Sequence, residues 1–168
     1  GCDRVQPFLK WPGGKRWIIS KYNKIFPKDF NNYIEPFLGG GSIFFYLAPT
    51  KALISDINKE LINTYLIMAN HPYKLKDLLK EHQKNHNSDY YYTIRNNNPT
   101  DNIEKAGRFL YLNRTCFNGM YRVNKKGHFN VPIGTKNHFI ADIDSFEKYS
   151  NILKKAQIVS KDFEEIIF

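Results

Sequence analysis

The stretch from Tyr33 to Ser42 most constrains the fold, because a short apolar run ends in Glu35 and three consecutive glycines follow it. An apolar segment, Ile43 to Leu47, then continues with helical character. Glycines lack a Cβ and permit positive φ, so the backbone can lie directly against a ligand. The unpaired amides that open the next helix would face that ligand. The order indicates a strand, a tight turn and a helix start, although a glycine triplet alone also fits an ordinary loop.

A second strand is expected over Lys51 to Ile57, an apolar run with Asp56 near its C-terminal end. Strand, glycine loop, helix and strand in this order predict a βαβ unit. An acid at the end of the second strand can accept hydrogen bonds from a ligand ribose, about 20 residues beyond the glycines. Asp56 follows Gly39 by 17 residues. The alternative is that Asp56 caps the helix predicted over Asn58 to Met68, and its two oxygens allow both roles.

The chain between that helix and Ile140 is patterned for helices rather than for βαβ units. Apolar spacing predicts a basic amphipathic helix over Tyr73 to His86 and another helix over Ile103 to Asn113. Asn87-Ser88-Asp89 is expected to cap a short helix that includes Tyr90, Tyr91 and Tyr92. This region therefore resembles an insertion into an α/β domain.

The last segment is expected to return to the sheet. A polar-to-helical stretch, capped by Asp142 or Asp144, precedes a short apolar strand at Gln157 to Ser160, and Asp162-Phe163 follows it. The resulting boundaries are residues 1–69 for the cofactor-binding part of the core, 70–140 for the insertion and 141–168 for the return to the core.

The formal charge of +9 is concentrated in the middle of the chain. Between Asn70 and Ile140 there are 12 Lys and Arg against 5 Asp and Glu, whereas the remainder has 13 against 11. All five histidines lie in the same stretch. Uniform lysine enrichment would indicate only solvated faces, but a local excess mixed with aromatic residues indicates a phosphate-binding surface. We therefore expect contact with nucleic acid.

Two segments outside the βαβ unit combine cations with aromatic residues. Pro7 to Lys15 places Trp11 between two lysines and beside a glycine pair, although each of these side chains taken singly also fits surface charge or core packing. Asn113 to Gly134 contains two turn signals, Asn118-Gly119 and Lys126-Gly127, which predict a hairpin. Its Arg, Lys and Asn side chains can reach guanine, phosphate and adenine, and Phe or Met can wedge between base steps. The alternative is an ordinary polar hairpin whose aromatic residues pack inward.

Composition excludes several classes of protein. No run approaches the roughly 18 apolar residues of a membrane span, and Gly1 to Gln6 contains no signal-peptide core. The two cysteines, Cys2 and Cys116, are far apart and match no metal spacing. A reduced, cytoplasmic setting without a metal site is the expectation.

Taken together, these motifs identify a resemblance to the S-adenosylmethionine-dependent DNA adenine-N6 methyltransferases of the Dam/DpnII type. The similarity runs from Phe8 to about Ile167. Phe-Leu-Lys-Trp-Pro-Gly-Gly-Lys resembles the family's N-terminal motif, with Pro12 where Ala is usual. Glu-Pro-Phe-Leu-Gly-Gly-Gly-Ser resembles its cofactor loop, and Ser-Asp-Ile-Asn resembles the segment with its ribose acid. The stretch from Asn113 to Gly134 resembles its target-recognition segment.

The resemblance implies an α/β fold, with an incomplete Rossmann-like methyltransferase core and a mostly helical DNA-recognition insertion that includes a β-hairpin. It also implies S-adenosyl-L-methionine as cofactor and double-stranded DNA as partner, with GATC as the expected site and Arg122 as the reader of guanine. The implied cofactor-binding residues are Trp11, Lys15, Gly39, Asp56, Asp162 and Phe163. The implied DNA-binding residues are Lys10, Asn118, Met120, Arg122, Lys125 and Pro132.

One departure from the family pattern affects the expected activity. Family catalysis uses an Asp-Pro-Pro-Tyr type motif after the recognition region, and no two prolines are adjacent in this chain. We therefore expect an N-terminal portion of an enzyme, without catalytic residues of its own and with an open sheet edge that a complementing C-terminal segment or a swapped dimer would cover. The alternatives are a non-catalytic DNA-binding module or half of a split methyltransferase.

Overall fold

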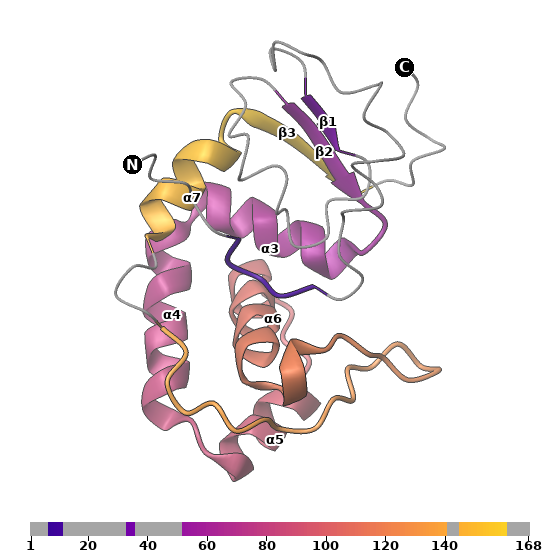
Figure 1. Ribbon diagram of the computed structural model, residues 1–168, viewed down its shortest axis with the longest axis vertical. Coiled ribbons are helices and arrows are strands. Elements are labelled where there is room, and N and C mark those ends of the chain that lie inside the picture. The colour runs from indigo at the N-terminus through magenta and orange to yellow at the C-terminus, as the bar shows by residue number, and fades with distance from the viewer. Residues whose placement is uncertain (1–6, 12–32, 36–51, 141–144, 161–168) are drawn as a thin grey trace.

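A small parallel sheet lies at one end of the molecule, with helices packed beneath it (Figure 1). The computed structural model describes residues 7–11, 33–35, 52–140 and 145–160. The strands are β1 (Tyr33–Glu35), β2 (Ala52–Asp56) and β3 (Ala156–Ser160), and β2 lies between the other two. Both pairings are parallel, with Ile34 opposite Leu53 and Ile54 opposite Ile158. The three strands predicted from the sequence are confirmed, and residues 156–160 do return to the sheet.

Helix α3 (Lys59–Asn70) connects the sheet to the helices beneath it. The Asn58 side chain caps it by accepting a hydrogen bond from the Leu61 amide at 3.0 Å. Its inner face buries Leu61, Tyr65 and Met68 completely. The helical spacing of the apolar residues also predicts that Leu66 belongs to this core, and this prediction is wrong, because Leu66 lies about 100° round the helix from Tyr65 and is 37% exposed.

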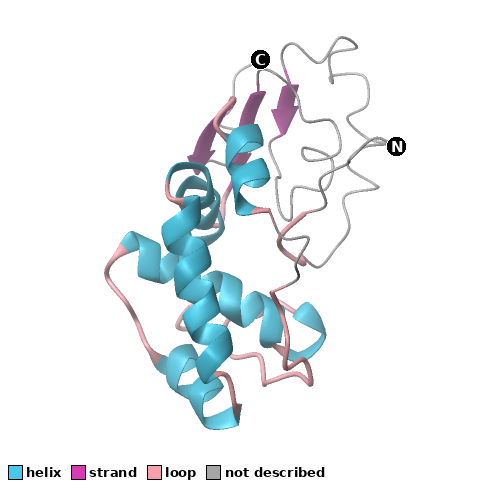
Figure 2. Cartoon of the chain, turned by 90° about the vertical axis from the view of Figure 1, so that its left-hand side faces the viewer, coloured by secondary structure: helices cyan, strands magenta, loops and turns pink. Residues whose placement is uncertain are grey.

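Three helices form the region below α3: α4 (Pro72–Asn85), α5 (Ser88–Asn96) and α6 (Asn102–Thr115) (Figure 2). Pro72 occupies the first turn of α4, where a missing N–H costs nothing. Asn87 caps α5, as predicted, by accepting from the Tyr90 amide at 2.8 Å. Asp101 caps α6 by accepting from the Glu104 amide at 3.0 Å. The helices predicted over this region are therefore confirmed, with ends shifted by a few residues.

Histidine–tyrosine pairs join α4 to α5 and α6. His82 Nδ1 lies 2.5 Å from the Tyr90 hydroxyl, and His86 Nδ1 lies 2.6 Å from the Tyr111 hydroxyl. Burial lowers the pKa of both histidines below the ordinary value, while the charge of Glu81 acts in the opposite direction on the pKa of His82. The neutral imidazoles are therefore part of the packed state.

The last described helix, α7 (Phe146–Leu153), packs on α3 and α4 and leads into β3. Ser145 caps it, since its hydroxyl accepts from the Lys148 amide at 3.4 Å. The expected caps, Asp142 and Asp144, lie outside the described residues, and the cap position itself belongs to Ser145. The Ser150 hydroxyl donates to the Ala69 carbonyl at 2.6 Å, which fixes α7 against the end of α3. Among the helices described, none has the length and apolar character that crossing a membrane requires.

Candidate nucleic-acid interface

The N-terminal segment, residues 7–11, is held against α6 by side chains rather than by a neighbouring strand. The Lys10 amide donates to Asn113 Oδ1 at 2.9 Å, and Asn113 Nδ2 donates to the Lys10 carbonyl at 2.6 Å. Arg114 donates to the Phe8 carbonyl through Nη2 at 3.2 Å and to the Phe139 carbonyl through Nη1 at 3.0 Å. Phe8 is buried, whereas the side chain of Lys10 is exposed. These bonds fix the backbone of Lys10 and leave its ammonium group at the surface.

Trp11 links this segment to the predicted recognition segment. Its ring stacks on Tyr121, with centroids 4.8 Å apart and planes at 28°, and lies 6.1 Å from the ring of Phe109. Trp11 is only partly buried. Its described contacts are thus aromatic residues of α6 and of the stretch that follows it.

Asp56 lies close to the same cluster. Its Oδ1 accepts a hydrogen bond from the Asn58 amide at 3.0 Å. The Asn58 side chain also forms a hydrogen bond with the hydroxyl of Tyr121, a phenol whose pKa is raised by burial. Since Asn58 provides the cap of α3, Asp56 acts on the turn before the helix. Tyr121 and Asn58 therefore connect Trp11 with Asp56. The other expected cofactor residues, Lys15, Gly39, Asp162 and Phe163, lie outside the described residues.

A short 3₁₀ helix, η1 (Phe117–Gly119), follows α6 and confirms the turn predicted at Asn118-Gly119. Both residues adopt positive φ, 53° at Asn118 and 61° at Gly119. A Cβ at Gly119 would lie 2.6 Å from Lys10 Cδ, so glycine lets the lysine stem cross the turn. Lys10 and Asn118, two of the expected DNA-binding residues, are both exposed at this crossing.

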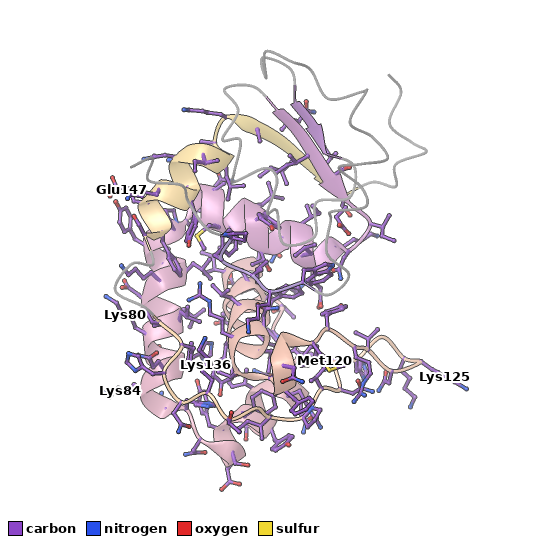
Figure 3. The ribbon with its side chains drawn as sticks, viewed as in Figure 1. Lys80, Lys84, Met120, Lys125, Lys136 and Glu147 are labelled. Carbon is purple, nitrogen blue, oxygen red and sulfur yellow. The ribbon has the colours of Figure 1, made fainter. Side chains whose placement is uncertain are left out.

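The predicted hairpin is present, with a single antiparallel bridge between Val123 and Phe129 in place of regular strands. The Asn124 amide donates to the His128 carbonyl at 2.8 Å, and the turn includes Gly127 at φ 83°. The hairpin extends away from the helices, with Lys125 at its outer end (Figure 3). An exposed arm of this kind has little core of its own, so its bonds to the body must position it.

Arg122 is oriented by the opposite side of the hairpin. Its Nε donates to Asn130 Oδ1 at 2.8 Å, and its Nη2 donates to the Asn130 carbonyl at 3.1 Å. These two bonds hold the plane of the guanidinium while its side chain is exposed. The outer edge, formed by Nη1 and the second Nη2 hydrogen, has the fork geometry that reads guanine.

The base of the hairpin is fastened to the body by backbone bonds. The Phe117 amide donates to the Pro132 carbonyl at 2.9 Å, and the Gly134 amide donates to the Thr115 carbonyl at 2.8 Å. The Tyr91 hydroxyl of α5 donates to the Val131 carbonyl at 2.8 Å. Pro132 therefore lies beside η1, and it is exposed.

A cavity of about 420 Å³ lies between the N-terminal segment, η1 and the chain after the hairpin. Among the described residues that line the cavity, the charged ones are Lys10, Arg114 and Lys136, and none carries a carboxylate. Phe8, Leu9 and Phe139 supply an apolar floor. A cavity lined by cationic and by aromatic side chains fits an anionic ligand that has a planar part, such as a nucleotide.

Phe117 is a surface residue that the sequence analysis did not single out. It is 49% exposed and lines the cavity, and Met120, three residues further on, is 38% exposed. Exposed apolar side chains beside cations fit the wedging of base steps. The sequence did contain a signal for this exposure, because Phe117 directly precedes the predicted turn at Asn118-Gly119. A turn that projects from the body exposes the residues next to it. Asn113 and Arg114 were likewise included only as part of the recognition segment, and no local pattern indicates their bonds to residues 8 and 10.

Comparison with known proteins shows the family of the chain. The model of the family "D12 class N6 adenine-specific DNA methyltransferase" matches residues 11–168. The chain is 41% identical to the type II methyltransferase M1.LlaDCHI of Lactococcus lactis subsp. cremoris, over 97% of this chain and 61% of that protein. It is 39% identical to the type II methyltransferase M.MjaIII of Methanocaldococcus jannaschii, over 95% and 63%. It is 36% identical to the DNA adenine methylase of Haemophilus influenzae, over 95% and 58%.

The chain therefore belongs to the D12 class of N6 adenine-specific DNA methyltransferases. The resemblance inferred from its motifs is confirmed at the level of the family. The chain spans about three fifths of the length of these curated relatives.

Proposed function

We propose that this chain supplies the cofactor-loop and target-recognition parts of a site-specific DNA adenine-N6 methyltransferase. The reaction moves a methyl group from S-adenosyl-L-methionine to the exocyclic nitrogen of an adenine in a short duplex site, and GATC is the site we expect. A cytoplasmic location follows from this function and from the two widely separated cysteines. The observation that supports the proposal most is the contact of residues 8–11 with the recognition segment.

Duplex reading is assigned to the exposed side chains around η1 and the hairpin. Arg122, with its guanidinium plane held by Asn130, reads a guanine through its outer edge. Asn118 and Lys10 meet the duplex where the lysine stem crosses Gly119. Phe117 and Met120 press against the stacked bases, and Lys125 contacts a phosphate at the end of the arm. Pro132 borders the same surface.

The residues that the structure describes fit S-adenosylmethionine at the edge next to this surface. Asp56 is a partly exposed carboxylate at the C-terminal end of a central parallel strand, which is where such folds bind a ribose. Trp11 offers an aromatic face that connects through Tyr121 and Asn58 to Asp56. We propose that these two residues, with Lys15, Gly39, Asp162 and Phe163, bind the cofactor. When bound, the cofactor supplies the electrophilic methyl group.

Methyl transfer needs a second contribution, because the Asp-Pro-Pro-Tyr type motif that positions the flipped adenine is absent from the 168 residues. We propose that a segment carrying this motif, on the same polypeptide or on a partner, completes the site and covers the edge of the incomplete Rossmann-like core. In this organisation residues 1–69 and 141–168 build the core, and residues 70–140 form the recognition insertion.

A transfer assay on duplex DNA tests the proposal. Radiolabelled S-adenosylmethionine is incubated with a GATC duplex and with either the chain alone or the chain plus a segment that carries the motif. The proposal expects label in the adenine N6 only with both parts present, and no label when that adenine is replaced. Label from the chain alone would refute the need for a second part.

The second candidate function is a DNA-binding module without catalysis, which the well-anchored hairpin favours. For such a module, the same samples should show duplex binding, and no methyl label should reach the DNA either with the chain alone or with the added segment. A wild-type protein that bound neither duplex nor cofactor would contradict both functions.

A further inference from the structure

The chain after the hairpin runs along one flank of α4. Gln83 Oε1 accepts hydrogen bonds from the Phe139 amide at 3.0 Å and the Ile140 amide at 2.9 Å. The ring of Phe139 meets the ring of His86 edge-on, with centroids 5.8 Å apart. Residues 136–140 are therefore fixed to the flank of α4 on which Gln83 lies.

Lysines follow this flank at a regular interval. Lys76, Lys80 and Lys84 recur every four residues, which places them about 6 Å apart along the axis. Asp77 and Glu81 each follow a lysine by one residue and so lie about 100° further round the helix. Each acid also precedes a lysine by three residues, Asp77 before Lys80 and Glu81 before Lys84, so the two carboxylates border the lysine row on one side.

Lys80, Lys84 and Lys136 are exposed, and Lys76 is half-buried. Lys80 and Lys84 project from the outer edge of α4, and Lys136 lies between α4 and η1 (Figure 3). Lys136 also lines the 420 Å³ cavity together with Lys10. The whole stretch from Asn113 to Ile140 contains five Lys and Arg and no Asp or Glu. No carboxylate of the stretch therefore separates the hairpin from α4 along this path.

We propose that Lys76, Lys80, Lys84 and Lys136, here named the α4 strip, bind the phosphate backbone of duplex DNA beyond the recognised site, on the side away from the hairpin. This proposal rests on the proposed function and extends its footprint. The three α4 lysines cover about 12 Å of helix axis, and phosphates of one strand recur every ~3.4 Å along a duplex. The strip therefore matches about three phosphates, and it contributes affinity and orientation without reading sequence.

The test measures binding of the full chain to duplexes of different length by fluorescence anisotropy. A short duplex of about 10 bp contains only the site, and two longer ones add about one helical turn on one side or on the other. The variant Lys76→Gln/Lys80→Gln/Lys84→Gln removes the three charges of the strip that lie on α4 and leaves Lys136 of the cavity in place. The matched control, Lys74→Gln/Lys148→Gln/Lys155→Gln, removes three exposed charges elsewhere. Circular dichroism establishes that both variants are folded.

The proposal predicts that only one of the two long duplexes binds more tightly than the short one. On that duplex the strip variant should lose about 3 from the slope of log K against log salt, between roughly 50 and 200 mM, at about 0.9 per phosphate contact. Its slope on the short duplex should equal that of the wild type, and the control should keep the wild-type slope on every duplex. Equal losses in variant and control, or equal losses on short and long duplexes, would overturn the proposal.

The variant Arg122→Ala separates this proposal from the proposed function. It should abolish preference for the site and leave the one-sided length dependence intact. A wild type with one-sided length dependence but no site preference would support the α4 strip and contradict site-specific methylation. A wild type with site preference but without any dependence of binding on duplex length would support site-specific methylation and contradict the α4 strip.

Discussion

The side-chain amide of Asn113 pairs with both backbone groups of Lys10, across 103 residues of sequence, at 2.9 Å and 2.6 Å. In this arrangement an asparagine on α6 takes the place that a neighbouring strand would have beside the N-terminal segment. The Lys10 stem then crosses Gly119, so the position of the ammonium group is coupled to η1 and to the base of the hairpin. Residues 7–11 and the start of the recognition segment therefore form one surface.

Asn113→Asp should separate residues 7–11 from α6. Aspartate keeps the acceptor for the Lys10 amide, but it places a second oxygen where a donor now faces the Lys10 carbonyl. We expect a loss of about 1–3 kcal/mol in the free energy of unfolding, measured by urea denaturation, together with weaker duplex binding. Asn63→Asp, whose amide donates to the Asn102 carbonyl in an exposed bond of 3.0 Å, is the control. Equal stability of the two variants would contradict the pairing.

Gly134→Ala should disturb the base of the hairpin. An added Cβ would lie 2.8 Å from the Cys116 carbonyl oxygen and 3.1 Å from that of Thr115, both backbone atoms of the end of α6. Accommodating it costs about 1–3 kcal/mol and moves the hairpin relative to η1. Thr135→Ala, at the next and exposed position, should stay within about 0.5 kcal/mol of wild type. The midpoints of urea denaturation measure the two stabilities. A Gly134→Ala variant as stable as Thr135→Ala would refute the close approach of Gly134 to the Cys116 carbonyl.

Stability should fall as the pH is lowered from about 7.5 to about 5. Burial lowers the pKa of His82 and His86 in the folded chain, so below about pH 6.5 the unfolded chain binds more protons and unfolding becomes more favourable. The contribution is fully present above the unfolded pKa and is lost as the pH falls towards the folded pKa. In His82→Gln the dependence of the urea midpoint on pH should be shallower, whereas His128→Gln, on the exposed hairpin, should keep the wild-type dependence. An unchanged dependence in His82→Gln would contradict this assignment.

Cys116 should resist alkylation in the folded chain. Burial raises the pKa of its thiol to about 11, and Sγ donates to the Met120 carbonyl at 3.2 Å. Since the thiolate is the nucleophile, iodoacetamide near pH 8 should label Cys116 much more slowly in the native chain than in urea. Peptide mass spectrometry follows Cys116 separately from Cys2. Equal labelling rates in native and denatured samples would show that the loop above Cys116 opens freely.

Local patterns predicted the elements, because strand length, helical period and capping residues are properties of neighbouring positions. Asn87 at the start of α5 and the paired turn signals of the hairpin are examples. The pairing of Asn113 with Lys10 and the stacking of Trp11 on Tyr121 could not be predicted in this way, since each joins residues more than a hundred positions apart. The helical period of the apolar residues also gave a wrong prediction at Leu66, which lies outside the buried face of α3.

Selection of duplexes from a randomised pool tests the central claim most directly, because it presumes no particular site. The chain is incubated with the pool at about 0.15 M ionic strength, and the bound duplexes are sequenced, for wild type and for Arg122→Lys. The account predicts that the wild type enriches one short motif that contains adenine and guanine, and that Arg122→Lys, which keeps the charge and loses the fork, relaxes the guanine position. A bound pool without any enriched motif, or the same motif at the same strength for both proteins, would contradict the account.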